Sequence, residues 1–252
     1  MNFICLASGS SGNCFYMALE RDGQPPVELL MEAGIPIKDI TDRLVNNGKR
    51  LRDIDAVLIT HSHGDHCKCA RQLIERGRRI YSNKTVLSMC GAGKADLLQH
   101  NVSKYIAPDT KVIPINVEHD APDSLGFIIS TGIETVLFIN DNKYFKADLS
   151  KIHFDYICIE ANYDDLTIKF ALNDARKNDE YQNIRRYERL LDSHLSLNHC
   201  IRILKKLDLS GCKAIFLMHL SERHANPAAF KKSVADATGI KTFVCRKNGG
   251  IL

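Results

Sequence analysis

The sequence has no long apolar run, no marked excess of charge of one sign and no paired cysteine framework. No stretch of about 18 consecutive apolar residues occurs, so we expect no membrane-spanning helix and no membrane partner. The 34 basic and 30 acidic residues leave a net charge of only +4. That balance does not indicate a dedicated nucleic-acid binder, although it is compatible with a local basic groove.

Targeting and linker features are also absent. The first five residues lack the basic start of a signal peptide. The nine cysteines are odd in number and lie mostly in apolar runs, which favours reduced thiols in a cytoplasm over a disulfide framework. Because there is no fixed-period repeat and no low-complexity linker, we expect one domain over residues 1–252.

The most informative stretch is a short apolar run followed by a polar cluster. Residues 56–59 are apolar and rich in β-branched side chains, which predicts a buried strand. The sequence H-S-H-G-D-H follows in a loop, and its four ligand-type side chains are His61, His63, Asp65 and His66. The two histidines that are two positions apart can face one metal ion, and the adjacent Asp–His pair can serve a second. The alternative is a polar surface loop, which four such side chains in six positions disfavour.

Similar patterns recur along the chain. Apolar runs predict strands over residues 3–7, 14–19, 27–31, 79–82, 111–117, 126–130, 135–139, 156–160, 213–218 and 242–245. Helical spacing predicts helices over residues 36–47, 69–76, most of 84–98, part of 163–192, a stretch after the N-cap Ser196, and 228–238. Strands precede helices in each half of the chain. This order favours two sheets packed face to face with helices outside.

H-S-H-G-D-H resembles the H-x-H-x-D-H signature of the metallo-β-lactamase fold. More narrowly, the A-S-G-S-S-G-N of residues 7–13 resembles the start of small bacterial and phage hydrolases of that fold. Those proteins include bacterial DNA exonucleases and phage anti-Pycsar phosphodiesterases, which degrade cyclic nucleotide immune signals. The resemblance implies an α/β fold, the αββα sandwich of two mixed sheets with helices on both outer faces.

The resemblance also implies a dinuclear metal site. His119, Asp141 and His219 each follow an apolar run, where each alone would be an ordinary strand-end residue. By analogy with the family, they join the central motif in two sets. One metal takes His61, His63 and His119; the other takes Asp65, His66 and His219; Asp141 bridges both. The expected cofactors are two Zn²⁺ ions, with Mn²⁺ as the alternative. Glu32 stands where the family usually has an aspartate that supports the site.

Two further segments carry expected catalytic or substrate-binding residues. The D-S-H-L-S of residues 192–196 is similar to a G-H-x-S segment of the family, which implies that His194 is a general acid alongside the catalytic Asp65. A capping histidine at a helix start is the alternative. The loop of residues 9–13 can cradle a phosphate through Ser10, Ser11 and Asn13, or it is only a tight turn between strands.

Residues 163–192 depart most from the family. They interleave arginines, including Arg185, Arg186 and Arg189, with Tyr181 and Tyr187. We expect a lid or a homodimer element in which Arg185 and Arg186 bind substrate phosphate. The alternative is a solvated helical face. For His224, in a loop near the C-terminus, a structural role is expected and a substrate contact is the alternative.

The expected reaction is metal-dependent hydrolysis of a phosphodiester, and two substrates compete. The first is a 3′,5′-cyclic nucleotide, a small partner favoured by the modest net charge and consistent with a phage protein that evades cyclic nucleotide defence. The alternative is DNA, cleaved by a 5′–3′ exonuclease of the bacterial type. Residues 7–13 and the His194 segment resemble the phosphodiesterases of the family, which disfavours a lactam or thioester as the substrate. The complete ligand set disfavours a non-catalytic metal-binding module.

Overall fold

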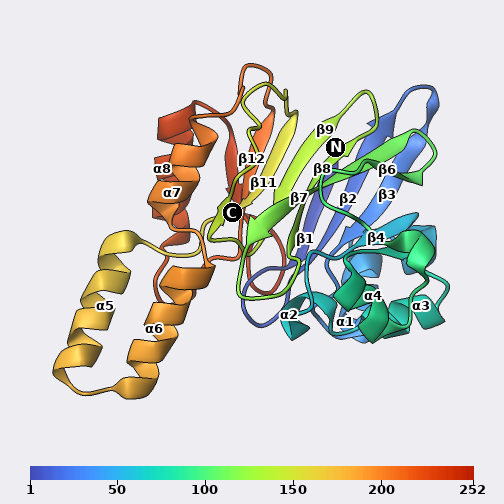
Figure 1. Cartoon of the computed structure of the whole chain (residues 1–252). Helices are drawn as coiled ribbons and strands as arrows, with labels where there is room; N and C mark the ends of the chain where they lie inside the picture. Colours follow the sequence, from blue (N-terminus) through green and yellow to red (C-terminus); the bar gives the residue numbers. More distant parts are fainter.

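The computed structural model describes all 252 residues, and the first part of the chain forms a mixed five-stranded sheet (Figure 1). Its order is β1-β2-β3-β4-β5, with antiparallel pairing from β1 to β3 and parallel pairing from β3 to β5. The strands are β1 (Asn2–Ala7), β2 (Cys14–Arg21), β3 (Gln24–Met31), β4 (Ala56–Leu58) and β5 (Ile80–Tyr81).

The remaining strands form a second mixed sheet of eight strands. The order is β10-β7-β8-β9-β11-β12-β13, and β6 pairs with β7 beside β10. Parallel pairing joins β9, β11, β12 and β13. The strands are β6 (Lys104–Ala107), β7 (Thr110–Glu118), β8 (Leu125–Ser130), β9 (Thr135–Ile139), β10 (Tyr144–Phe145), β11 (Tyr156–Glu160), β12 (Ala214–Met218) and β13 (Thr242–Val244).

The main core lies between the two sheets. Along β2, the side chains of Phe15, Met17 and Leu19 face the second sheet, because alternate residues of a strand point to opposite faces. The rings of Phe15 and Phe138 meet edge to face with centroids 5.8 Å apart. Tyr16, which lies between two of these residues, packs on the opposite face of the first sheet.

Helices cover both outer faces of the sandwich (Figure 1). The first sheet packs against α1 (Ile37–Asn46), α3 (Ala70–Glu75) and α4 (Lys84–Cys90), and the second against α7 (Leu197–Leu204) and α8 (Pro227–Thr238). Two short 3-10 turns span Leu51–Asp53 and Lys94–Asp96. The predicted fold class is therefore confirmed. Ser196 caps α7 as predicted, by accepting a hydrogen bond from the His199 amide. None of the helices has both the length and the apolar character needed to cross a membrane.

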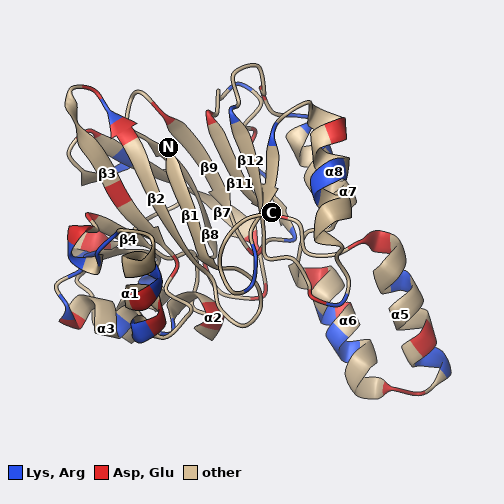
Figure 2. Ribbon diagram, turned by 180° about the vertical axis from the view of Figure 1, so that it is seen from behind, with Lys and Arg blue, Asp and Glu red and all other residues tan.

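Residues 163–192, predicted to be helical in part, form a helical hairpin. Helices α5 (Asp165–Lys177) and α6 (Tyr181–Ser193) lie side by side and extend away from the sheets (Figures 1 and 2). A small core of Ile168, Leu172 and Tyr187 holds them together. Asp164 starts α5 by accepting hydrogen bonds from two backbone amides. The lid or dimer role of this hairpin stays a prediction.

The pattern analysis missed some short elements and misjudged some boundaries. Strands β6 and β10 were not predicted, because both are short and pair only with the edge of β7. The predicted helix over residues 84–98 ends at Cys90, where Gly91 adopts a left-handed φ of 77°. Strand β3 begins at Gln24, three residues before the predicted strand over residues 27–31.

Three loops are joined by their backbones beneath the central histidine motif. The Asn13 amide donates to the Asp65 carbonyl over 2.8 Å, and the Ala33 amide donates to the His66 carbonyl over 2.7 Å. The Gly34 amide donates to the Asn13 carbonyl over 2.9 Å. A Cβ atom added at Gly34 would lie 1.6 Å from the Asp65 carbonyl oxygen. This position therefore has no room for a side chain.

We expect Gly34→Ala to lower the free energy of unfolding by roughly 3 kcal/mol and to displace Asp65, because the methyl group would meet rigid backbone. Gly93→Ala is the matched control, since an added Cβ there meets nothing within 4 Å. Urea unfolding and metal content measure the two effects. Equal stability of both variants would contradict the close approach of Gly34 to the Asp65 loop.

Candidate metal centre and active site

Seven ionisable side chains converge at one edge of the two sheets. Each stands at, or just beyond, the carboxyl end of a strand or in the loop after it. All the residues that the sequence analysis proposed as metal ligands fall into two groups whose ligand atoms lie within 4.8 Å of one another. The first group is His61, His63 and His119, and the second is Asp65, His66, Asp141 and His219. The central motif is not wholly a loop, because Asp65 and His66 lie in the short helix α2 (Gly64–Cys67).

The first group consists of three imidazoles. The Nδ1 atom of His63 lies 3.1 Å from His61 Nε2 and 3.2 Å from His119 Nε2. These separations match the distance of about 3.3 Å between ligand atoms of a tetrahedral zinc ion. The Nδ1 atom of His119 donates to the Ser193 carbonyl over 2.8 Å, which leaves Nε2 with a free lone pair. The three nitrogens can therefore hold one ion.

The second group adds two carboxylates. His66 Nε2 lies 3.6 Å from Asp65 Oδ2 and 3.2 Å from Asp141 Oδ2. The same Asp141 oxygen is 3.8 Å from His119 Nε2, so this carboxylate adjoins both groups. His219 Nε2 lies 3.9 Å from Asp65 Oδ2. The bridging role of Asp141 between two ions stays a prediction.

The chemistry of the site fits divalent cations. The Nε2 atom of His219 is buried and has no hydrogen-bond partner, which is costly unless a ligand satisfies it. Burial acts to lower the pKa of His66, but the carboxylates of Asp141 and Glu32 outweigh it and raise that pKa well above its usual value. The negative potential that favours a proton on this ring also favours a metal cation.

Glu32 supports the centre from behind, despite being longer than the usual aspartate of the family. Its buried carboxylate accepts hydrogen bonds from the backbone and hydroxyl of Thr60, and one oxygen lies 3.3 Å from His66 Nδ1. The Thr60 hydroxyl in turn contacts His61 Nδ1 over 2.9 Å. Glu32 thus orients one imidazole of each metal-binding group.

Three residues of the centre have a left-handed backbone. The φ angles are 65° at Glu32, 46° at Asp141 and 54° at His219. Such angles cost non-glycine residues about 1–2 kcal/mol each. Strained backbone of this kind concentrates at functional sites, where the surrounding structure holds it in place. At each of these three residues the left-handed backbone turns the chain at the end of a strand and directs the side chain toward the metal centre.

Glu160 is the one buried carboxylate of the site that the sequence analysis did not select. One oxygen contacts His194 Nδ1 over 2.7 Å and His219 Nδ1 over 3.1 Å. The other accepts from the backbone amides of Asn142 and Leu195. Burial alone would lower the pKa of His194, but Glu160 outweighs it and raises that pKa to about 9. Glu160 is the last residue of an apolar strand, and His119, Asp141 and His219 also stand at strand ends. This shared position is the sequence signal that could have identified Glu160.

The structure separates the residues expected to bind substrate. Ser10 and Arg186 line the cleft beside the metal centre, whereas Ser11 and Arg185 are exposed outside its lining. Asn13 is fully buried, and its amide contacts the Gly9 backbone and His66 Nε2 instead of facing the cleft. These contacts give Asn13 a structural position beneath the site.

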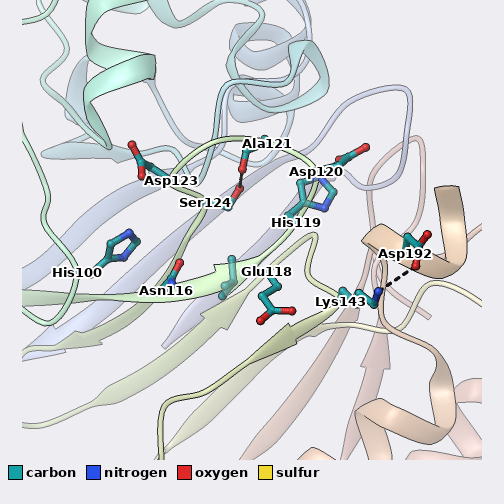
Figure 3. A pocket seen from close by; sticks show the side chains of 11 residues that line it. His100, Asn116, Glu118, His119, Asp120, Ala121, Asp123, Ser124, Lys143 and Asp192 are labelled. Carbon is teal, nitrogen blue, oxygen red and sulfur yellow. Dashed lines mark hydrogen bonds and ion pairs between the residues drawn. The ribbon is translucent and has the colours of Figure 1, made fainter.

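The cleft above the metal centre has a volume of about 620 Å³ and a polar lining. His194 and the side chains of three arginines, Arg186, Arg189 and Arg223, line it together with ligands of both groups. A second hollow of about 540 Å³ lies beyond His119 and contains Glu118, Asp120, Asp123 and Asp192, the last paired with Lys143 (Figure 3). Of the two hollows, the first therefore has the lining that favours an anion.

Comparison with known proteins identifies the class to which this arrangement belongs. The family model described as "Beta-lactamase superfamily domain" matches residues 36–220. The chain belongs to this family, and it has the metallo-β-lactamase fold.

The curated relatives share part of their length with this chain. Exodeoxyribonuclease WalJ of Streptococcus pneumoniae (strain D39) is 31% identical over 173 residues, which cover 64% of this chain and 62% of the relative. Exodeoxyribonuclease YycJ of Bacillus anthracis is 26% identical over 160 residues, 57% of this chain and 55% of the relative. The chain thus aligns with less than two thirds of either relative.

Solved structures support the fold over nearly the whole chain. The metallo-β-lactamase fold protein YhfI from Bacillus subtilis covers 99% of this chain and is itself covered over 98%, with a TM-score of 0.69 and 14% identity. The alignment with the short form of human tRNase Z covers 88% of this chain and 94% of that protein, with a TM-score of 0.60 and 17% identity. At such identities the likeness shows the fold alone.

We expect elemental analysis of the purified chain to find about two divalent ions. Replacing both His61 and His63 with alanine should remove at least one of them and most hydrolytic activity, because two of the three nitrogens in the first group are lost. The control is His153→Ala, an exposed histidine outside both groups. Full metal content and activity in the double variant would contradict the assignment.

Proposed function

We propose that the chain is a dinuclear, metal-dependent phosphodiesterase that removes nucleotides from the 5′ end of DNA, with zinc or manganese as the metal. The observation that carries this proposal is the cleft, in which three arginines and a histidine face the paired ligand groups. Arginine binds phosphate through two parallel hydrogen bonds, so this lining suits a phosphodiester. The names of the curated relatives support DNA as the substrate.

A cyclic mononucleotide, the first expectation from the sequence, has less support. The base of such a nucleotide needs an aromatic or polar contact, and the tyrosines of residues 163–192 are candidates for it. Tyr163 and Tyr187 are buried, and Tyr181 is exposed at the start of α6, with none of them in the cleft lining. The chain by itself therefore offers no tyrosine for a base to stack on.

The residues of the chain have distinct roles in the proposed reaction. When bound, a pair of divalent cations activates water and neutralises charge on the phosphoryl oxygens. Glu160 holds His194 through Nδ1, so Nε2 is the ring atom free to deliver a proton to the leaving oxygen. Arg186, on α6, binds the anionic substrate. The carboxylate of Asp65 lies between the rings of His66 and His219 as a ligand of the second group.

A substrate panel tests the proposal directly. With Zn²⁺ or Mn²⁺, we expect hydrolysis of 5′-phosphorylated DNA to exceed that of cyclic mononucleotides and cyclic dinucleotides, because the cleft offers arginines and no stacking tyrosine. Product length on gels and nucleotide release by chromatography measure the rates. Efficient cleavage of cyclic mononucleotides with intact DNA would replace the exonuclease proposal by the cyclic nucleotide one.

We expect His194→Ala to lower turnover of DNA by a factor on the order of 10² to 10⁴, with metal content unchanged. The loss should shrink for bis-p-nitrophenyl phosphate, because its leaving group needs no proton. His199→Ala, an exposed histidine on α7, is the control. An equal loss on both substrates, or loss of a metal, would refute the general-acid role.

A further inference from the structure

His224 is a buried ring without partners in a polar cleft. Its side chain lines the cleft, the residue is only 7% exposed, and neither ring nitrogen has a hydrogen-bond partner. Buried polar atoms of native proteins are almost always satisfied by protein, water or ligand. The unpaired nitrogens therefore indicate a group that enters the cleft from outside.

The surroundings of His224 carry uncompensated positive charge. Arg186 and Arg223 line the same cleft, and neither guanidinium forms an ion pair. The neighbouring carboxylate of Glu222 is paired with Lys247 over 2.5 Å. Arg189, in contrast, is paired with Asp120 over 2.6 Å. Two free guanidinium groups beside an unpaired imidazole favour an anion.

The protonation of His224 agrees with a hydrogen-bonding role. Burial lowers the pKa of His224, and the charges of Arg186 and Arg223 lower it further. The neutral ring has one N–H donor and one acceptor nitrogen. It can donate to a phosphate oxygen without adding a third charge to the pair of arginines.

The three residues come from two elements that the fold fixes against each other. Arg186 belongs to α6, whereas Arg223 and His224 follow β12 and the proposed ligand His219. The ring of Tyr187 packs edge-on against His224 with centroids 5.2 Å apart. The Asp164 amide donates to the His224 carbonyl over 2.8 Å. The helical hairpin thus holds the histidine in position before any substrate binds.

We propose that Arg186, Arg223 and His224 form a second phosphate subsite, which binds a phosphate of the strand adjacent to the one that is cleaved. The inference rests on the proposed function and extends it. A 3′,5′-cyclic mononucleotide has a single phosphate and cannot fill both this subsite and the metal centre. The subsite therefore selects a substrate with at least two phosphates, such as a nucleic acid strand.

Arg223→Ala and Arg186→Ala test the subsite, because both side chains are exposed enough to be removed without disturbing the core. We expect each to raise KM for a 5′-phosphorylated oligonucleotide about tenfold, as for a lost charged hydrogen bond, with little change in kcat. Because bis-p-nitrophenyl phosphate has one phosphate, each variant should raise its KM by a smaller factor than it raises the KM for the oligonucleotide. Arg202→Ala on α7 is the control, an exposed arginine outside the cleft. Equal losses on both substrates would overturn the subsite.

Oligonucleotides with and without a 5′-phosphate show which phosphate is bound. If Arg223→Ala raises KM only for oligonucleotides that carry a 5′-phosphate, the subsite binds the terminal phosphate. If KM rises equally without the 5′-phosphate, the subsite binds an internal phosphate. Either result supports the subsite.

If the wild-type chain cleaves no DNA, the proposed function fails, and an inhibition assay still tests the subsite. Thymidine 3′,5′-bisphosphate should then inhibit bis-p-nitrophenyl phosphate hydrolysis more strongly than thymidine 5′-monophosphate, and Arg223→Ala should abolish the difference. Equal inhibition of the wild type by both nucleotides would overturn the subsite.

Discussion

Three carboxylates, those of Glu32, Asp141 and Glu160, are almost wholly buried at one edge of the sandwich, and their charge must be balanced there. Removing a carboxylate from water costs several kcal/mol unless opposite charge and hydrogen bonds compensate it. Burial acts to raise the pKa of Asp141, but the rings of His219 and His66 overcome it and lower that pKa well below its usual value. The imidazoles of this edge supply part of this balance, and divalent cations held by the two ligand groups would complete it in place of protons.

Much of this arrangement could be predicted from the sequence, because its physical basis is local. Apolar runs predicted most strands, and the resemblance to the metallo-β-lactamase family, added to the position of His119, Asp141 and His219 after such runs, predicted that these three side chains converge. The short strands β6 and β10 could not be predicted in this way. They exist because the edge of β7 offers backbone groups to pair with, and that edge is a property of the folded sheet.

The residues that were missed or misplaced depend on distant partners. Glu160 resembles any charged residue at a strand end until the fold places His194 and His219 against it, 34 and 59 positions later in the chain. The Gly/Ser loop suggested a phosphate cradle, yet Asn13 is used to join two other loops. Along α6, helical periodicity alone does not say which face meets the cleft, so Arg185 and Arg186 were equivalent in the sequence and differ in the structure.

The two ligand groups draw on both sheets, since the central motif follows β4 of the first sheet whereas His119, Asp141 and His219 follow strands of the second. Any ion held between them would cross-link the two layers, much as a disulfide joins distant parts of a chain. Such a cross-link binds only the assembled sandwich, so its binding energy adds to the free energy of unfolding. With ions bound in this way, the resistance of the protein to heat and denaturant would depend on the free metal concentration around it.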